Sequence, residues 1–420
     1  NATIRMGLSD GTSTTNADVA VTSNVIYVTR TDSDADGDAA DGFSLAEALA
    51  IANNGDTILL ADGTYRGQFD VTKAVTIDAV NGAAGHVTIE SPNSGDLVGV
   101  APEMLTNNGR WRMPVINVHT PDPAQGTVTI KNITINGRDQ GLADGFANNK
   151  DLLGIGIVNS NAIIDNVTLT NFRSTDSTEW GWGENFPILA EADSSLTNKV
   201  SVTIQNSDIS NFQKTGIVGW GPMLDITVDN TTITGSGTSG ISGQNGIQIG
   251  SGGLRPGTTA TITDNTITNF GFLSADYRAS GVLLVYADTS SITGNTFEGV
   301  TGGAGGFVGV GINDVLNTST VLTISGNTLV NADYGVLNEA VVKSVLNIGS
   351  NDFSGATVAV HDSYLITDPA TETPFDNDTT INLQSTVAPA SGRLAYYLYD
   401  GADSFTDTGT VDSIVYGGGG

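Results

Sequence analysis

Eight short segments of this 420-residue chain repeat one pattern: an alternating apolar strand, an asparagine at a turn, and a second strand. Successive asparagines lie 34, 40, 24, 35, 30, 32 and 24 residues apart. A constant unit separated by inserts of varying length is typical of a solenoid, in which each repeat buries its apolar face against its neighbours. The sequence therefore predicts an all-β solenoid whose turns carry Asn132, Asn166, Asn206, Asn230, Asn265, Asn295, Asn327 and Asn351.

Asparagine suits such a turn for two reasons. It tolerates the left-handed backbone conformation, and its side-chain amide both donates and accepts hydrogen bonds. Asparagines at matching corners of successive turns are therefore predicted to form a hydrogen-bonded ladder that satisfies the turn carbonyls. The alternative is that each asparagine is an isolated turn former.

One helix is predicted near the N-terminus, in the segment SLAEALAIANNGDTILLADGTYRG. Ser44 and Glu47 form a capping box, an apolar stripe follows, and Asn54-Gly55 supplies the stop, so about ten residues near 45–53 are expected to be helical. This order of elements resembles the N-terminus of right-handed parallel β-helix proteins, a family that includes pectate lyases and many bacterial surface proteins. The resemblance implies that the helix covers the open end of the coil.

Three regions are expected along the chain. Residues 1–25 form a polar segment, residues 26–370 form the parallel β-helix with its capping helix, and residues 371–420 form a β segment without the asparagine frame. Since the first residue is Asn1 rather than Met, we expect a processed chain or part of a longer protein. The longest inserts lie between repeats, and loops on a rigid scaffold are where binding is usually found.

Charge and cysteine content exclude several classes of function. The formal net charge is −29, with 45 Asp and Glu against 16 Lys and Arg, so the chain would repel nucleic acid and anionic membrane surfaces. No apolar stretch is long enough to insert into a bilayer. The absence of cysteine excludes thiolate catalysis, cysteine-based zinc sites and disulfides. Divalent cations are natural partners of such an acidic surface, although acidity can also serve solubility alone.

A calcium site is predicted in the run TDSDADGDAADG. The carboxylates of Asp32, Asp34, Asp36 and Asp38 alternate as in the first half of a calcium loop, but Phe43 stands where an EF-hand has its bidentate Glu. The alternative is a solvated acidic turn. The chain's end, VDSIVYGGGG, resembles the entry into the calcium-binding repeats of the repeats-in-toxin family. That resemblance implies type I secretion from a Gram-negative bacterium and folding on extracellular calcium.

Three tryptophans are candidates for stacking on sugar rings. Trp180 and Trp182 lie in the longest insert, in EWGWGE, and Trp220 follows in GIVGWGP. Aromatic faces flanked by polar groups suit a glycan-binding surface. The alternative is that these rings cover the wall of the solenoid.

Catalytic residues are harder to identify. A polysaccharide lyase needs a base beside a uronate carboxylate and a cation to stabilise the developing charge. The candidates are Lys214, Tyr277, Arg278, Tyr286 and the pair Lys150-Asp151, but the basic residues are scattered singly along the chain, which favours an ordinary structural role for each. No pair of histidines has metal-binding spacing, and the motifs of alginate epimerases (Asp-Pro-His-Glu) and polygalacturonases (paired Asp, Gly-His-Gly) are absent.

The sequence thus favours a secreted, calcium-dependent structural or adhesive protein of a bacterial surface, bound to calcium and to polysaccharide or identical subunits. The alternatives are a lyase or epimerase of an acidic polysaccharide, and a non-catalytic glycan-binding module. Fold alone does not decide among these functions.

Overall fold

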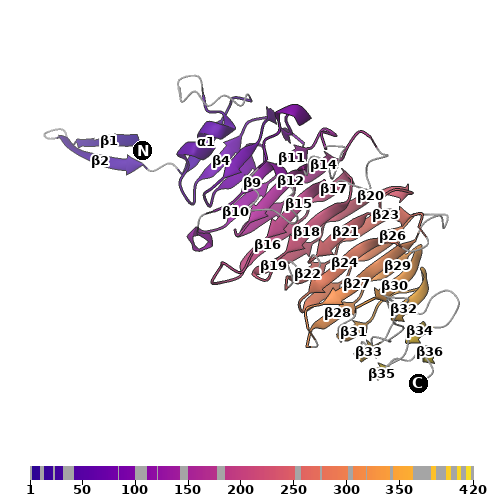
Figure 1. Cartoon of the computed structure of the whole chain (residues 1–420). Helices are drawn as coiled ribbons and strands as arrows, with labels where there is room; N and C mark the ends of the chain where they lie inside the picture. Colours follow the sequence, from indigo (N-terminus) through magenta and orange to yellow (C-terminus); the bar gives the residue numbers. More distant parts are fainter. Residues whose placement is uncertain are drawn as a thin grey trace.

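The computed structural model describes residues 2–9, 14–21, 24–31, 42–83, 85–99, 111–120, 122–141, 150–176, 185–250, 257–274, 277–300, 306–317, 319–340, 344–362, 380–384, 394–398, 404–407 and 413–417. They form an elongated coil in which three parallel sheets run along the axis (Figure 1). The all-β solenoid is confirmed. Among the described residues, no helix is long and apolar enough to cross a membrane.

The first sheet contains one strand from each turn of the coil. Its strands, in order along the axis, are β3 (Val25–Val28), β4 (Thr57–Leu60), β7 (Thr76–Ala79), β10 (Val128–Lys131), β13 (Ala162–Asp165), β16 (Val200–Gln205), β19 (Leu224–Asp229), β22 (Thr259–Thr263), β25 (Ser290–Thr293), β28 (Val321–Ser325), β31 (Val345–Gly349), β33 (Thr380–Gln384) and β35 (Ser404–Asp407).

The second sheet follows the asparagine corner. Its strands are β5 (Gly63–Arg66), β8 (Val87–Glu90), β11 (Thr134–Asn136), β14 (Thr168–Phe172), β17 (Asp208–Phe212), β20 (Thr232–Ser239), β23 (Thr266–Phe272), β26 (Thr296–Gly299) and β29 (Thr328–Val330).

The third sheet closes each turn. Its strands are β6 (Phe69–Val71), β9 (Trp111–Val118), β12 (Lys150–Val158), β15 (Phe186–Glu191), β18 (Thr215–Trp220), β21 (Asn245–Ile249), β24 (Ala279–Ala287), β27 (Phe307–Val315), β30 (Ala332–Asn338), β32 (Ala356–Asp362), β34 (Leu394–Leu398) and β36 (Ser413–Gly417). In the described connections, Ser94–Asp96 and Pro123–Gln125 form 3₁₀ turns.

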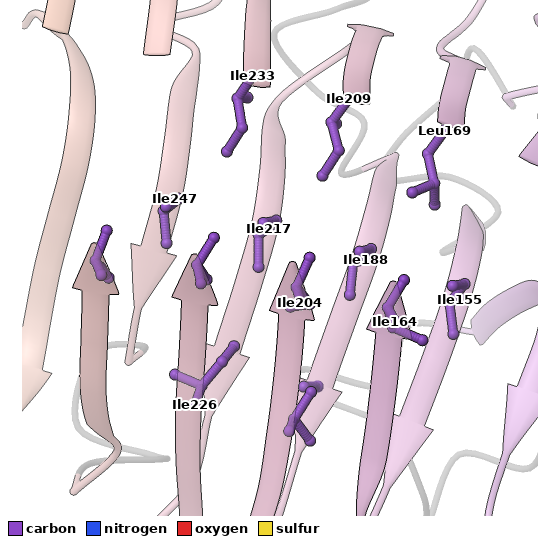
Figure 2. Close-up of a cluster of buried hydrophobic side chains, with 14 of the residues drawn as sticks. Ile155, Ile164, Leu169, Ile188, Ile204, Ile209, Ile217, Ile226, Ile233 and Ile247 are labelled. Carbon is purple, nitrogen blue, oxygen red and sulfur yellow. The ribbon is translucent and has the colours of Figure 1, made fainter. Parts of the chain in front are cut away.

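The interior is filled by columns of aliphatic side chains that repeat from turn to turn. Ile164, Ile204 and Ile226 come from the first sheet and face Ile188 and Ile217 of the third (Figure 2). All are at most 1% exposed. Each isoleucine contributes about 1.5–3 kcal/mol by leaving water. Alternation of apolar and polar residues along each short strand produces this core, because successive side chains point to opposite faces.

The N-terminal end has the predicted helix, α1 (Leu45–Ile51), shorter than the expected ten residues. Its capping box is confirmed: the Ser44 amide donates to Glu47 Oε2 at 2.9 Å and the Glu47 amide to Ser44 Oγ at 3.3 Å. The helix ends early because Ala52 takes an extended ψ of 152°. Lys73 Nζ then donates to the carbonyls of Ala50 and Ala52. Leu45 and Ala48 pack into the first turns, so the helix covers the end of the coil (Figure 1).

The two ends of the chain depart from the three-sheet coil. β1 (Ala2–Ser9) and β2 (Thr14–Val21) form a separate antiparallel hairpin, which extends away from the α1 end (Figure 1). Beyond β32, strands β33 to β36 alternate between the first and third sheets, and in the described residues the second sheet ends at β29. Among the described residues, the last turns therefore contribute two strands each, one to the first sheet and one to the third.

The asparagines occupy two columns of the corner between the first and second sheets, which corrects the prediction of a single ladder. The outer column has positive φ at Asn132, Asn166, Asn206 and Asn230. In the next four turns Asp264, Gly294, Gly326 and Ser350 take this left-handed position. The asparagine then follows one residue later and points inward, so the inner column contains Asn265, Asn295, Asn327 and Asn351.

The two columns differ in burial and in hydrogen bonding. In the outer column Asn166 Nδ2 donates to Asn132 Oδ1 at 2.8 Å, and Asn230 Nδ2 to Asn206 Oδ1 at 2.7 Å, both at the surface. In the inner column the Nδ2 atoms of Asn265, Asn295 and Asn327 each donate at 2.9 Å to the Oδ1 of the asparagine in the next turn, and all four residues are at most 1% exposed. The inner ladder is therefore the continuous, buried one.

Candidate functional site

A groove of about 710 Å³ lies on the outer face of the third sheet, across strands β21, β24, β27 and β30, with Lys214 before β18 at one end. Its floor is mixed, with the polar residues Asn245 and Ser280 beside the apolar Leu283 and Val308. Lys214, Tyr277 and Arg278 lie at the edge where the strands begin, because each precedes the first residue of β18 or β24. Three of the predicted catalytic candidates thus line one groove.

Lys214 is the residue immediately before β18. Its Nζ donates to the carbonyl oxygen of Gly243 at 2.9 Å. Since Gly243 also lines the groove, this hydrogen bond holds the ammonium group at the groove wall.

Arg278 is held over an aromatic ring. Its Cζ lies 4.8 Å from the centroid of the Tyr334 ring, a cation–π contact, and its Nε lies 3.7 Å from Asp333 Oδ2. That separation is too long for a hydrogen bond, and the buried Nε has no hydrogen-bond partner among the described residues. The side chain is 28% exposed, so the guanidinium is both positioned and accessible from the groove. A guanidinium that is partly open to the groove suits an anionic ligand such as a carboxylate.

Glu339 lines the opposite edge of the groove, directly after β30. Burial raises the pKa of its carboxyl, and the positive charge of Arg278 partly opposes this rise. His361 of β32 packs edge-on against Tyr334, with ring centroids 5.0 Å apart. Burial, and then the charge of Arg278, lowers the pKa of His361, which favours a neutral imidazole. Arg278 therefore acts electrostatically on both groups.

The remaining catalytic candidates lie elsewhere. Tyr286 has a positive φ of 53°, and the charge of Asp314 raises the pKa of its hydroxyl. Asp151 is completely buried in an ion pair with Arg112, which makes it a structural group. Asp151 and Tyr286 are thus not among the residues that line the groove, and the side chain of Lys150 lies outside the described part of the chain.

Trp220 is buried, which corrects its assignment as a sugar-stacking residue. It is 3% exposed and meets the Phe186 ring edge-on with centroids 6.3 Å apart, while Arg112 Cζ lies 5.7 Å from the Trp220 ring centroid. A ring enclosed in this way has no face open to a sugar. Trp180 and Trp182 lie outside the described residues.

The histidines His86 and His119 each pair with a single carboxylate in the described part of the chain. His86 pairs with Asp62 at 3.3 Å, and His119 lies 4.0 Å from Asp70. Within the described ranges, no group of three or more His, Asp or Glu side chains is arranged to hold a metal. Asp32, Asp34, Asp36 and Asp38 lie outside these ranges, as does most of the C-terminal VDSIVYGGGG segment except the backbone of β36.

Sequence reasoning missed Glu339 and the floor residue Asn245. Both adjoin a strand of the third sheet, and the signal was their position beside an apolar run: Asn245 before GIQI and Glu339 after GVLN. The register that aligns Asn245 with Thr215 and Ser280 is visible only once the strands are paired.

Comparison with known proteins agrees with this architecture. A family model described as the right handed beta helix region matches residues 188–367. Polygalacturonase from Erwinia carotovora ssp. carotovora aligns with a TM-score of 0.51 at 14% identity, over 90% of this chain and 98% of that chain. Alginate lyase from a Paenibacillus species aligns with a TM-score of 0.48 at 17% identity, over 82% of this chain and 96% of that chain.

At such low identity these likenesses concern the fold alone. No curated protein sequence matches the chain significantly. Together with the three parallel sheets, the comparisons show that the chain folds as a right-handed parallel β-helix.

Proposed function

We propose that the chain binds and cleaves an acidic polysaccharide in the groove of the third sheet, as a lyase. The observation that carries the proposal is the meeting of Lys214, Tyr277 and Arg278 in one groove, where the Arg278 side chain is 28% exposed. The polygalacturonase among the structural neighbours is named for an acidic polysaccharide and supports the same substrate class.

The groove contains the groups that β-elimination requires. A base removes the proton on the carbon next to the uronate carboxylate, the adjacent C–O bond to the leaving sugar breaks, and a carbon–carbon double bond forms. Arg278 is placed to neutralise the uronate carboxylate as charge develops. Lys214 and Tyr277 are the groove residues that can exchange the proton.

Ultraviolet absorbance of unsaturated uronate products tests the proposal. We expect product from at least one member of a panel of uronate polymers. Arg278→Ala should lower kcat/KM by about 10²–10³-fold, the scale of losing one electrostatic stabiliser. Lys214→Ala should lower it by about 10²–10⁴-fold if Lys214 is the base.

Matched controls are available on the other two sheets. Lys199 pairs with Asp225 at 2.8 Å on the first sheet, and Arg66 pairs with Glu90 at 2.9 Å on the second. Lys199→Ala and Arg66→Ala should leave the rate unchanged. Equal losses in groove and control variants, or no product from any polymer, would exclude the lyase.

A calcium-dependent structural or adhesive role at a bacterial surface is the second proposal. The net charge of −29 and the alternating aspartates from Asp32 to Asp38 favour it, and extracellular location and type I secretion belong to the same proposal. We expect a chelator to lower the melting temperature and to change the assembly state. Unchanged melting and assembly after chelation would count against calcium.

A further inference from the structure

Three exposed apolar side chains lie along one side of the groove. Ile241 is 44% exposed, Leu273 is 56% exposed and Tyr277 is 72% exposed. Ile241 and Tyr277 line the groove, and Leu273 follows Phe272, which lines it as well. In the described part of the chain, the other large apolar side chains that are exposed all precede residue 100. A group of exposed apolar side chains at the mouth of a groove marks a binding surface.

Two neighbouring connections of the coil bring these side chains together. Residues 240–244 connect β20 to β21, and residues 273, 274, 277 and 278 belong to the connection from β23 to β24. Because β20 pairs with β23 and β21 pairs with β24, the two connections are adjacent. The Leu273 amide donates to the Ser239 carbonyl at 2.8 Å, and a Cβ added to Gly243 would lie 3.1 Å from the Phe272 ring. We call Ile241, Phe272, Leu273 and Tyr277 the apolar rim.

Cations border the apolar rim. Lys214 Nζ donates to the Gly243 carbonyl at 2.9 Å, which places the ammonium group beside the first connection. Arg278 follows Tyr277 in the chain, and its guanidinium extends along the groove to lie over the Tyr334 ring. A ligand that fits this surface is apolar on one face and anionic at its edge. The ring of a uronate has both properties, because its C–H groups form an apolar face and its carboxylate is charged.

A second copy of this chain suits the apolar rim less well than a uronate does. In a twofold-symmetric dimer the same surface of both copies meets, so Lys214 and Arg278 of one copy would lie opposite the same cations of the other. Each copy also carries a formal net charge of −29, which opposes association. An acidic sugar chain instead meets cations at the rim and continues directly into the groove.

Given the proposed function, we infer that the apolar rim is a sugar-binding subsite of the groove, in which Tyr277 stacks against the apolar face of a uronate ring. Ile241, Phe272 and Leu273 extend the apolar surface around this ring. In the proposed reaction Tyr277 then holds the substrate, and Lys214 is the group that exchanges the proton. The stacking role for which the sequence suggested tryptophans is thus assigned to a tyrosine.

The affinity for uronate oligosaccharides tests the inference. Calorimetry measures the Kd of galacturonate, mannuronate and heparosan oligosaccharides, and the wild-type chain should bind at least one of them. Tyr277→Ala should weaken this binding about three- to tenfold, the scale of one aromatic contact. Tyr277→Phe keeps the ring and should stay within about twofold of the wild-type Kd. The loss in Tyr277→Ala should be the same at low and high salt, because the contact involves no charged group.

A second variant and a matched control keep the test independent of the tyrosine hydroxyl. Ile241→Ser removes a neighbouring part of the apolar rim and should weaken binding about threefold. Tyr27→Ala removes another exposed ring, 58% exposed on β3 of the first sheet, and should leave the Kd unchanged.

The possible results separate the inference from the proposed function. If the wild type binds but Tyr277→Ala binds equally well, or if Tyr277→Phe loses as much as Tyr277→Ala, the inference is wrong while the lyase proposal stands. If Tyr277→Ala instead abolishes a wild-type dimer in sedimentation, the rim is an interface between copies and the inference is again wrong. If binding follows the expected pattern but no unsaturated product forms, the lyase fails and the subsite stands. If the folded wild type binds none of the oligosaccharides, both fail.

Discussion

Asparagine has two different roles in neighbouring columns of the same corner. In the outer column its tolerance of the left-handed conformation is used, as at Asn206 with a φ of 51°. In the inner column its hydrogen-bonding capacity is used. Asn327 Oδ1 accepts from the amide and the Nδ2 of Asn295, and Asn327 Nδ2 donates to the carbonyl of Ile292 at 2.9 Å. Losing an inner asparagine leaves several buried polar groups without partners.

The substitution Asn327→Ala should therefore destabilise the fold by about 2–4 kcal/mol, because an unsatisfied buried polar group costs about 1–3 kcal/mol. Asn206→Gly should cost less than about 1 kcal/mol, since glycine also adopts positive φ and Asn206 is exposed. Denaturant midpoints of both variants measure the difference. Equal costs for the two substitutions would contradict the assignment of separate roles.

His361 should make stability depend on pH. Its pKa in the folded chain is lowered by burial and by Arg278, so between this pKa and the ordinary histidine value near 6.5 the unfolded chain binds more protons. The free energy of unfolding should then fall as pH drops below about 6.5. His361→Gln should remove this component, whereas His86→Gln, whose side chain is 56% exposed, serves as the control. Parallel pH profiles for wild type and His361→Gln would contradict this.

At the scale of elements, a column of glycines in the third sheet adjoins the groove floor. A Cβ added to any of them would lie within 2.8 Å of a carbonyl oxygen on the next strand, closer than real Cβ atoms approach. Because these positions leave no room for a side chain, glycine allows the backbones of neighbouring strands to approach each other there. The members of the column are Gly216, Gly246, Gly281, Gly309 and Gly335.

Gly246→Ala should destabilise the fold by about 1–3 kcal/mol, the usual cost of overpacking, because its Cβ would lie 2.6 Å from the Gly281 carbonyl oxygen. Gly240→Ala is the matched control, since nothing lies within 4 Å of a Cβ there. The denaturant midpoints of both variants measure stability, and their lyase rates measure whether the geometry of the groove has changed. An equal, small effect of both substitutions would show that the backbone can relax at Gly246.

The strands, turns and capping helix could be predicted from the sequence, but the set of residues that lines the groove could not. The asparagine frame predicted the coil, and Ser44 with Glu47 predicted the helix start. The sequence did not reveal that Asn230 belongs to the outer column and Asn265 to the inner one. Both lie in the same tripeptide, Asp-Asn-Thr, but the left-handed residue is the asparagine at Asn230 and the aspartate, Asp264, in the next turn. Lys214, Arg278 and Glu339 are 64 and 61 residues apart, and only the strand register brings them to one groove.

At the scale of the whole molecule, the net charge of the chain affects how a polysaccharide approaches the groove. A net charge of −29 opposes the approach of a polyanion, so binding depends on the local cations of the third-sheet groove. Salt screens long-range repulsion more than a close ion pair. We therefore expect moderate salt to speed association with the polymer, while Arg278→Ala still weakens binding at every salt concentration. Stopped-flow association rates at several salt concentrations measure this, and slower association with added salt would contradict it.

The location of bound polysaccharide tests the central claim most directly. Amide hydrogen exchange of the full chain, with and without a saturating heparosan or galacturonate oligosaccharide, reports which strands are covered. The account predicts slower exchange in segments 241–245, 277–283 and 308–313, and none of this protection in Arg278→Ala. Protection confined to the first and second sheets, or no protection with any uronate oligosaccharide, would contradict it.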